Sequence, residues 1–159
     1  MDGLRDKVRT ILNRLKVENA PVPIDDVVKL FSIPVVNYSH FPESVSGTFI
    51  KDEDFQVIGI NDKMANTRKR YTIAHELGHY FLGHDHQRSI HENFDEPTDK
   101  EREANKFAAE LLMPIDFLKK DVEKIGITVP DLSKKYEVSD QAMSIRLLET
   151  KLIDKIKSA

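Results

Sequence analysis

The feature that most constrains this 159-residue chain is a pair of histidines, His75 and His79, four positions apart in a mainly apolar stretch. The apolar residues around the pair predict an α-helix that begins with Thr67 as its N-cap and ends at Gly83. At about 100° per residue, a helix sets the two imidazoles only about 40° apart and one turn from each other. Both imidazoles can therefore reach a single metal ion.

A glutamate, Glu76, directly follows His75 and completes the pattern His-Glu-x-x-His, which is typical of zinc hydrolases. Its side chain projects about 100° round the helix from His75, so it borders the metal and does not bind it as an equal ligand. A carboxylate in that position can take a proton from the attacking water, and we predict this catalytic role for Glu76. The opposite face is apolar, which predicts packing against a core. Its residues are Ile73, Ala74, Leu77, Tyr80 and Phe81.

A catalytic zinc ion takes three protein ligands and leaves its fourth position to water. Because the chain has no cysteine, the third ligand must be a histidine or a carboxylate. A second helix, predicted over 99–112, carries Glu101 within its core-facing stripe, where a carboxylate is costly unless it is paired or metal-bound. Glu101 is therefore the predicted third ligand. Glu103, which lies outside the stripe, is the alternative candidate. Asn105, one turn after Glu101, is predicted to hydrogen-bond a ligand.

The polar segment 84–98 has no periodicity, which predicts a loop. On a continued helix His84 would face the apolar side, so it is a weaker candidate ligand than Glu101. Three other side chains of the segment are weaker still, namely Asp85, His86 and His91. A structural alternative stays open, in which Glu101 and Glu103 merely favour the positive N-terminal end of their helix.

The rest of the chain predicts a small sheet and several short helices. Strands are expected over 33–38, 46–50 and 55–60, the last two as a hairpin, and helices over 24–31, 115–125, 129–136 and 140–152. A further helical period ends near residue 20. The predicted fold class is α+β, with a three-stranded antiparallel or mixed sheet beside the histidine helix and a helical C-terminal half. We expect one domain over 1–159, with a helical subdomain over about 114–159.

Charge and composition argue against several classes of function. A net charge of -3 gives no basic field that would attract nucleic acid or an anionic membrane. The chain has no apolar stretch of about 18 residues, and its N-terminus lacks the apolar core of a signal peptide. The absence of cysteine fits a reducing compartment. A cytoplasmic, soluble protein is expected.

Two segments in this order carry a specific resemblance: IAHELGHYFL at 73–82 and ExxANxFAAELLMP at 101–114. Together they resemble the ImmA/IrrE family of metallo-endopeptidases, bacterial and phage proteins that cleave a DNA-binding repressor. The resemblance extends to 45–48, 58–61 and 138–147, so it covers about residues 20–150. The family often has aspartate where this chain has Asn105.

The resemblance implies a zincin-like fold and a zinc-dependent endopeptidase. In the family's pattern Glu101 is a metal ligand, so His75, His79 and Glu101 would hold one zinc ion while Glu76 acts as general base. Manganese or iron could occupy the same ligands. The implied substrate is a protein, namely a helix-turn-helix (Xre-like) repressor of a mobile element, a phage or a stress response. We further conjecture that an extended peptide adds to the sheet at the strand 55–60, taken as an edge.

Two rival functions remain. Residues 132–146 have the helix-turn-helix pattern of a DNA-binding module. Its second helix begins with Asp140 and has Arg146 as its main cation, so phosphate attraction would be weak, and packing or substrate docking is favoured over direct nucleic-acid binding. The other rival is a non-catalytic binding or sensor protein that the metal only stabilises, because intact ligands show capacity and not turnover.

Overall fold

The structure is a computed structural model that describes residues 2–83, 88–92 and 98–156. Helices and a mixed sheet build it, so the predicted α+β class is confirmed. No helix in these described ranges is both long enough and apolar enough to cross a membrane.

The chain forms two compact units, and the boundary between them falls within helix α4 (Asp99–Leu112). We call residues 23–108 the sheet unit, because it contains all the described strands. Residues 1–22 and 109–159 together make the helical unit. The first helix of the chain thus belongs with the C-terminal helices, which no local pattern in the sequence indicates.

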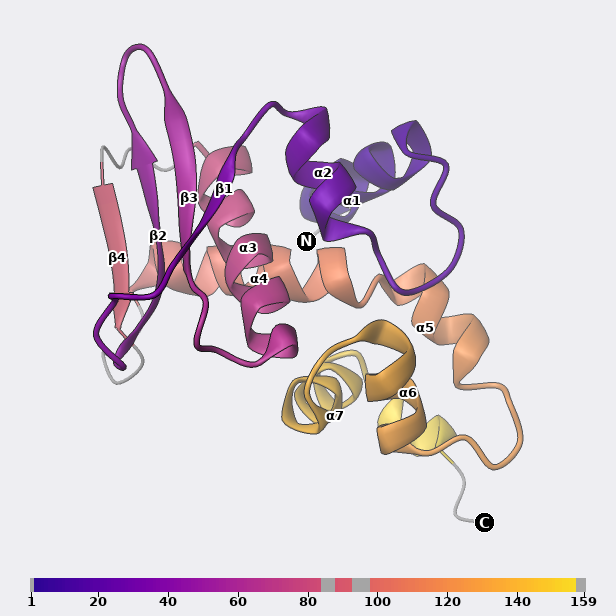
Figure 1. Ribbon diagram of the computed structural model, residues 1–159. Helices are drawn as coiled ribbons and strands as arrows, with labels where there is room; N and C mark the ends of the chain where they lie inside the picture. Colours follow the sequence, from indigo (N-terminus) through magenta and orange to yellow (C-terminus); the bar gives the residue numbers. More distant parts are fainter. Residues whose placement is uncertain (1, 84–87, 93–97, 157–159) are drawn as a thin grey trace. The chain divides into compact units, whose positions relative to one another are not determined.

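The sheet unit is built on a sheet whose four described strands lie in the order β1-β3-β2-β4 (Figure 1). Strand β1 is parallel to β3, whereas β2 is antiparallel to both β3 and β4. The sheet is mixed, which is one of the two forms predicted, and the predicted β2–β3 hairpin is confirmed. The strand bounds are Val35–Tyr38 for β1, Val45–Lys51 for β2, Gln56–Asn61 for β3 and Arg88–Glu92 for β4.

Strand β4 lies within the segment 84–98 that was predicted to be a loop, so that prediction is wrong for Arg88–Glu92, and the sheet gains a strand beyond the three expected. The five residues include only one apolar side chain, Ile90, and therefore show no alternation of apolar and polar positions. The strand forms because its backbone pairs with the side of β2 that β3 leaves open, an interaction that a local pattern does not encode.

The conjectured peptide-binding edge is also corrected. Strand β3 lies between β1 and β2, so both of its sides already carry backbone hydrogen bonds. Strands β1 and β4 end the described sheet instead. Sequence order does not reveal this arrangement, because the hairpin strand β3 pairs with a strand that precedes the hairpin as well as with its hairpin partner.

Helix α3 (Asn66–Phe81), which carries the histidine pair, packs along the sheet and contacts β2 and β3 (Figure 1). The close approach depends on Gly47 of β2. A Cβ at Gly47 would lie 2.6 Å from Thr72 Cγ2 of the helix and 2.8 Å from the backbone oxygen of Gly59. A side chain at this position would therefore push the helix off the strand.

The predicted start of α3 is off by two residues. Ala65 is the N-cap and makes no side-chain capping bond, while Thr67 lies inside the first turn. The backbone N–H of Lys69 still donates to Ala65 O, at 2.9 Å. The helix begins early because packing of the element, and not a cap, stabilises it.

The helical unit contains α1 (Asp2–Arg14), the end of α4 and the C-terminal helices. The C-terminal helices are α5 (Ile115–Asp121), α6 (Val129–Tyr136), α7 (Asp140–Glu149) and the short 3-10 helix η1 (Ile153–Lys155). Helices α5 and α7 end earlier than predicted, by four and three residues. Side chains of Leu118, Leu132, Tyr136, Met143 and Leu147 form part of its fully buried core.

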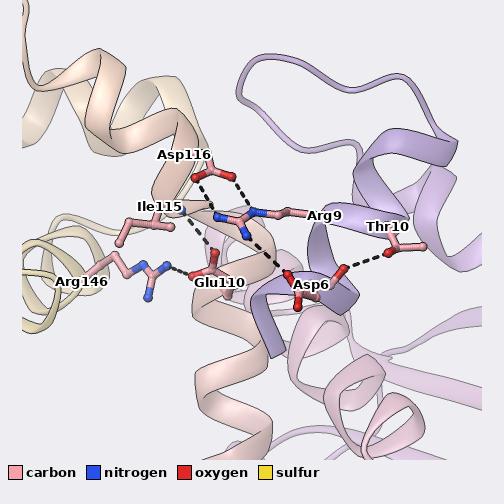
Figure 2. Close-up of polar contacts among 7 residues, drawn as sticks. All are labelled: Asp6, Arg9, Thr10, Glu110, Ile115, Asp116 and Arg146. Atoms are coloured by element: carbon pink, nitrogen blue, oxygen red, sulfur yellow. Dashed lines mark hydrogen bonds and ion pairs between the residues drawn. The ribbon is translucent and has the colours of Figure 1, made fainter. Parts of the chain in front are cut away.

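Polar contacts join the elements of the helical unit (Figure 2). Arg9 of α1 donates through Nε and a terminal nitrogen to the two carboxylate oxygens of Asp116 in α5, at 2.8 and 3.2 Å. A buried ion pair joins Arg146 of α7 to Glu110 of α4. Arg146 Nε also donates to Met113 O at 3.0 Å, and the Ile115 N–H donates to Glu110 Oε1 at 3.4 Å. The pair thus fixes both the end of α4 and the turn into α5.

Candidate metal centre

The middle of α3 is buried on all sides, from Thr72 to His79. His75 is 7% exposed, His79 is 1% exposed and Glu76 is fully buried. Burial of an ordinary apolar helix face would cover only the side opposite the histidines. The polar front of the helix is therefore enclosed as well, as expected of a ligand-bearing face.

Helix α4 crosses α3 closely at Gly78. A Cβ at Gly78 would lie 2.9 Å from both Cα and O of Ala104, and 3.2 Å from Cβ of Phe107. Only a glycine allows this approach without a shift of one helix. The crossing brings the first turns of α4 beside the histidine pair.

The start of α4 is set by Thr98, whose Oγ1 accepts a hydrogen bond from the Glu101 backbone N–H at 3.2 Å. Thr98 O also accepts from the Arg102 N–H, at 2.9 Å. These bonds are those of a helix N-cap, and they place Glu101 in the first turn of the helix. Its side chain is one-quarter exposed, at 24%, so this is the part of the cluster that meets solvent.

Three predicted ligands converge. Glu101 Oε2 lies 2.8 Å from His75 Nε2, and Glu101 Oε1 lies 3.1 Å from His79 Nε2. One donor atom from each of the three residues lies within 4.8 Å of the others. Zinc bonds of about 2.0–2.1 Å at tetrahedral angles separate neighbouring donors by about 3.4 Å. Two imidazoles and one carboxylate that lie this close together could hold one divalent ion.

The hydrogen bond predicted for Asn105 is present. Its Oδ1 lies 2.7 Å from His75 Nδ1, on the side of the ring away from Glu101. The same oxygen accepts a hydrogen bond from Tyr71 Oη at 3.3 Å. Tyr71 did not enter the sequence-based set, although its position one turn before His75 on the same helix face was a usable signal.

The remaining candidates do not join the cluster in the described structure. Glu103 is exposed on α4, outside the group of converging donors. His84, Asp85 and His86 lie outside the described residues, and of His91 only the backbone, in β4, is described.

The structure argues against the DNA-binding alternative, because Arg146, the main cation of the second helix, is buried. Arg146 is 7% exposed and is held in the ion pair with Glu110, so it is not available to phosphate groups. The exposed charged side chains of α7 are both acidic, Asp140 and Glu149. A recognition helix with this surface would repel the nucleic-acid backbone.

In this α+β unit, two histidines of one helix and a carboxylate of the next helix face each other, a His-His-Glu set that could hold one metal ion. Residues 32–148 match the peptidase family whose model is described as the IrrE N-terminal-like domain. The match spans well over half of the chain, which therefore belongs to this family, and the resemblance seen in the sequence is confirmed.

Among solved structures, the fold is similar to that of a protein described as a "Mycobacterium tuberculosis transcriptional regulator", with a TM-score of 0.68. The two share 15% sequence identity, so the likeness concerns the fold alone. The similarity covers 92% of this chain but 46% of the other, so the chain spans about half the length of that protein. No curated protein matches the chain.

Proposed function

We propose that this protein is a zinc-dependent endopeptidase that acts on a protein substrate. The observation that carries the proposal is the convergence of His75, His79 and Glu101, from two helices, with donor atoms close enough to hold one divalent ion. Membership of a peptidase family supports the same reading.

In this proposal the two imidazoles and the Glu101 carboxylate hold the ion. The donor set favours zinc, although manganese or iron accepts the same ligands. A zinc ion held there would polarise the scissile carbonyl group and make a water molecule acidic enough to attack near neutral pH. Glu101 neutralises part of the positive charge, and the partly exposed side of its carboxylate leaves an approach for substrate.

Glu76 is the proposed general base. It directly follows His75 on a fully buried part of α3, where its backbone position is fixed by the packed helix. Its carboxylate takes a proton from the attacking water and passes that proton to the amine that leaves when the peptide bond breaks. The products are a carboxylate and an amine, so the proton balance closes.

The proposed substrate is a helix-turn-helix repressor, from a mobile element, a phage or a stress response. The support is the resemblance to repressor-cleaving proteins, together with a structural neighbour that is named a transcriptional regulator. An extended segment of such a substrate can add to the described sheet only at β1 or β4, which end the strand order.

The test is to co-express the protein with candidate helix-turn-helix repressors, above all one encoded next to it, and to follow repressor cleavage on gels. Wild type should cleave one of them, and Glu76→Gln should not, with a rate loss of about 100-fold or more from removal of a general base. Cleavage that survives Glu76→Gln would refute the catalytic role.

Metal analysis of the purified proteins tests whether a loss of cleavage comes from the catalytic step or from loss of the metal ion. Glu76→Gln should retain zinc, because Glu76 is not a ligand in the proposal, whereas His79→Ala should lose it. Zinc bound in full together with no cleavage of any repressor would instead favour a non-catalytic, metal-stabilised binding protein.

A further inference from the structure

A chain of three polar side chains leads away from the candidate metal centre. Asn105 Oδ1 lies 2.7 Å from His75 Nδ1 and accepts a hydrogen bond from Tyr71 Oη at 3.3 Å. Within the described part of the chain, both hydrogen bonds that the structure gives the Asn105 side chain end on this one oxygen. Tyr71 and His75 belong to α3, and Asn105 belongs to α4.

The chemistry of the amide oxygen fixes the proton on His75. An amide oxygen accepts hydrogen bonds and cannot donate one, so Nδ1 of His75 must carry the hydrogen in this contact. The neutral ring then has its lone pair on Nε2, the nitrogen that faces Glu101. That is the tautomer in which His75 can bind a metal through Nε2.

An asparagine amide can present either of two groups to its neighbour. Rotation by about 180° exchanges the oxygen and the NH₂ group at almost no cost in shape. In the rotated state the NH₂ group would donate to Nδ1 of His75, which would leave the ring hydrogen on Nε2 and prevent ligation there. A phenol hydroxyl is a stronger donor than acceptor, so the Tyr71 hydroxyl favours the state that turns the amide oxygen inward.

We propose that Tyr71 is a positioning residue: its hydroxyl holds the Asn105 amide oxygen against His75 and so keeps His75 in its metal-binding tautomer. This inference rests on the metal site of the proposed function. It predicts that the Tyr71 hydroxyl affects zinc affinity only while residue 105 is an amide. The two oxygens of a carboxylate are equivalent, so a carboxylate at position 105 would present the same group to His75 in either orientation.

The test measures zinc affinity by competition with a chromophoric chelator at fixed pH. Tyr71→Phe keeps the ring and removes only the hydroxyl, and it should weaken zinc binding by about tenfold, the lower end for loss of a group behind a ligand. Asn105→Ala should weaken it by about ten- to hundredfold. Tyr80→Phe is the matched control on the same helix, where the ring packs against Phe31 and Phe81, and it should bind zinc as wild type does.

The decisive comparison repeats the Tyr71 substitution in an Asn105→Asp background. There, Tyr71→Phe should change zinc affinity by less than about twofold, so the two positions should show strong coupling in a double-mutant cycle. The thermal unfolding of the metal-free proteins is recorded beside it, and Tyr71→Phe should unfold at the wild-type temperature.

Three results would overturn the inference while leaving the proposed function in place. The first is wild-type zinc affinity in Tyr71→Phe. The second is an equal loss of affinity from Tyr71→Phe whether or not Asn105→Asp is also present, and the third is a loss that only parallels lower stability of the metal-free protein. A wild-type protein that binds no zinc would overturn both proposals, and so the two failures are distinguishable.

Discussion

Glu101 and Glu103 are only two positions apart on α4, yet their surroundings differ. Glu101 contacts the Nε2 atoms of both histidines, whereas Glu103 is exposed. The difference follows from the helical repeat, because two residues span about 200° of rotation and therefore point to nearly opposite sides. A choice between the two as ligand can accordingly be tested one side chain at a time.

Glu101→Ala should reduce bound zinc to background, because two imidazoles do not retain a catalytic ion. Glu103→Ala is the matched control and should bind zinc with wild-type affinity, since an exposed substitution on the same helix changes stability by only about 0.5 kcal/mol or less. The measurement is zinc content after dialysis, with affinity by chelator competition. Loss of zinc in Glu103→Ala with retention in Glu101→Ala would exchange the two assignments.

Among the secondary-structure elements, helices α3 and α4 build the candidate metal centre, and its geometry depends on how closely they cross. The Cα atom of Ala104 would lie 2.9 Å from a Cβ placed at Gly78, a distance that real side chains do not tolerate against backbone. The Glu101 carboxylate reaches both histidines across this tight crossing. Gly78 therefore serves the site although it carries no ligand atom.

Gly78→Ala should separate the two helices and lower the free energy of unfolding by about 1–3 kcal/mol, the usual cost of overpacking. Zinc affinity should fall as well, because Glu101 moves with α4. Gly3→Ala is a suitable control, since no atom lies within 4 Å of a Cβ at that position. Thermal unfolding and chelator competition on the same samples check both effects, and unchanged zinc affinity in Gly78→Ala would contradict this view of the crossing.

A second element-scale feature is the ion pair between Glu110 and Arg146, both nearly fully buried. A buried charge is tolerated only while its partner is present. Arg146→Met should therefore destabilise the protein by about 3–5 kcal/mol, because Glu110 would remain buried without its cation. The double variant with Glu110→Gln should recover part of this loss, as judged by urea unfolding. A single variant as stable as wild type would show that the pair contributes nothing.

At the scale of the whole molecule, acid should destabilise the helical unit through two carboxylates. Burial acts to raise the pKa of Asp121, but hydrogen bonds from Lys135 and Tyr136 outweigh it and hold the pKa below its ordinary value of 3.8. The hydrogen bond from Arg9 likewise lowers the pKa of Asp116. Asp116 is half-exposed, so solvent screening weakens its contribution and Asp121 dominates.

The sign of the effect follows from linkage. A carboxylate with a lowered pKa in the folded state binds protons more weakly than in the unfolded chain, so its stabilisation is complete above the ordinary pKa and is lost as the pH falls through the lowered value. The urea midpoint of the metal-free protein should thus stay level from about pH 7 to 5 and drop below about pH 4. Asp121→Asn should flatten that drop, whereas the exposed Asp154→Asn should not. An unchanged pH profile in Asp121→Asn would contradict the assignment.

Local sequence patterns were sufficient to predict the two helices that carry the candidate site. The spacing of His75 and His79 and the apolar residues between them predict a helix, and helix geometry alone places both imidazoles on one side. The same reasoning selected Glu101 over Glu103 and identified Asn105 as a partner of a ligand, a contact that is now observed. These predictions could be made because each compares residues within one or two turns of the same helix.

Several other contacts between distant segments could not be predicted from the sequence. Strand β4 forms by pairing with β2, and β3 is an inner strand, because backbone hydrogen bonding is nearly independent of side-chain identity. The N-cap of α3 is Ala65 and not Thr67, because packing outweighs a cap worth about 1 kcal/mol. The hydrogen bond from the Tyr71 hydroxyl to Asn105 also joins two helices, so the position of Tyr71 on the His75 face of α3 did not by itself predict it.

Ligand chemistry and helical spacing are both local properties, so the amino-acid sequence was enough to identify the candidate metal ligands. The folded structure was needed to bring Glu101 to both histidines, because that contact requires α3 and α4 to cross at Gly78. It likewise decided that Arg146 is buried against Glu110 instead of facing solvent. Such pairings depend on which distant surfaces can pack without voids or clashes, and no short stretch of residues specifies that.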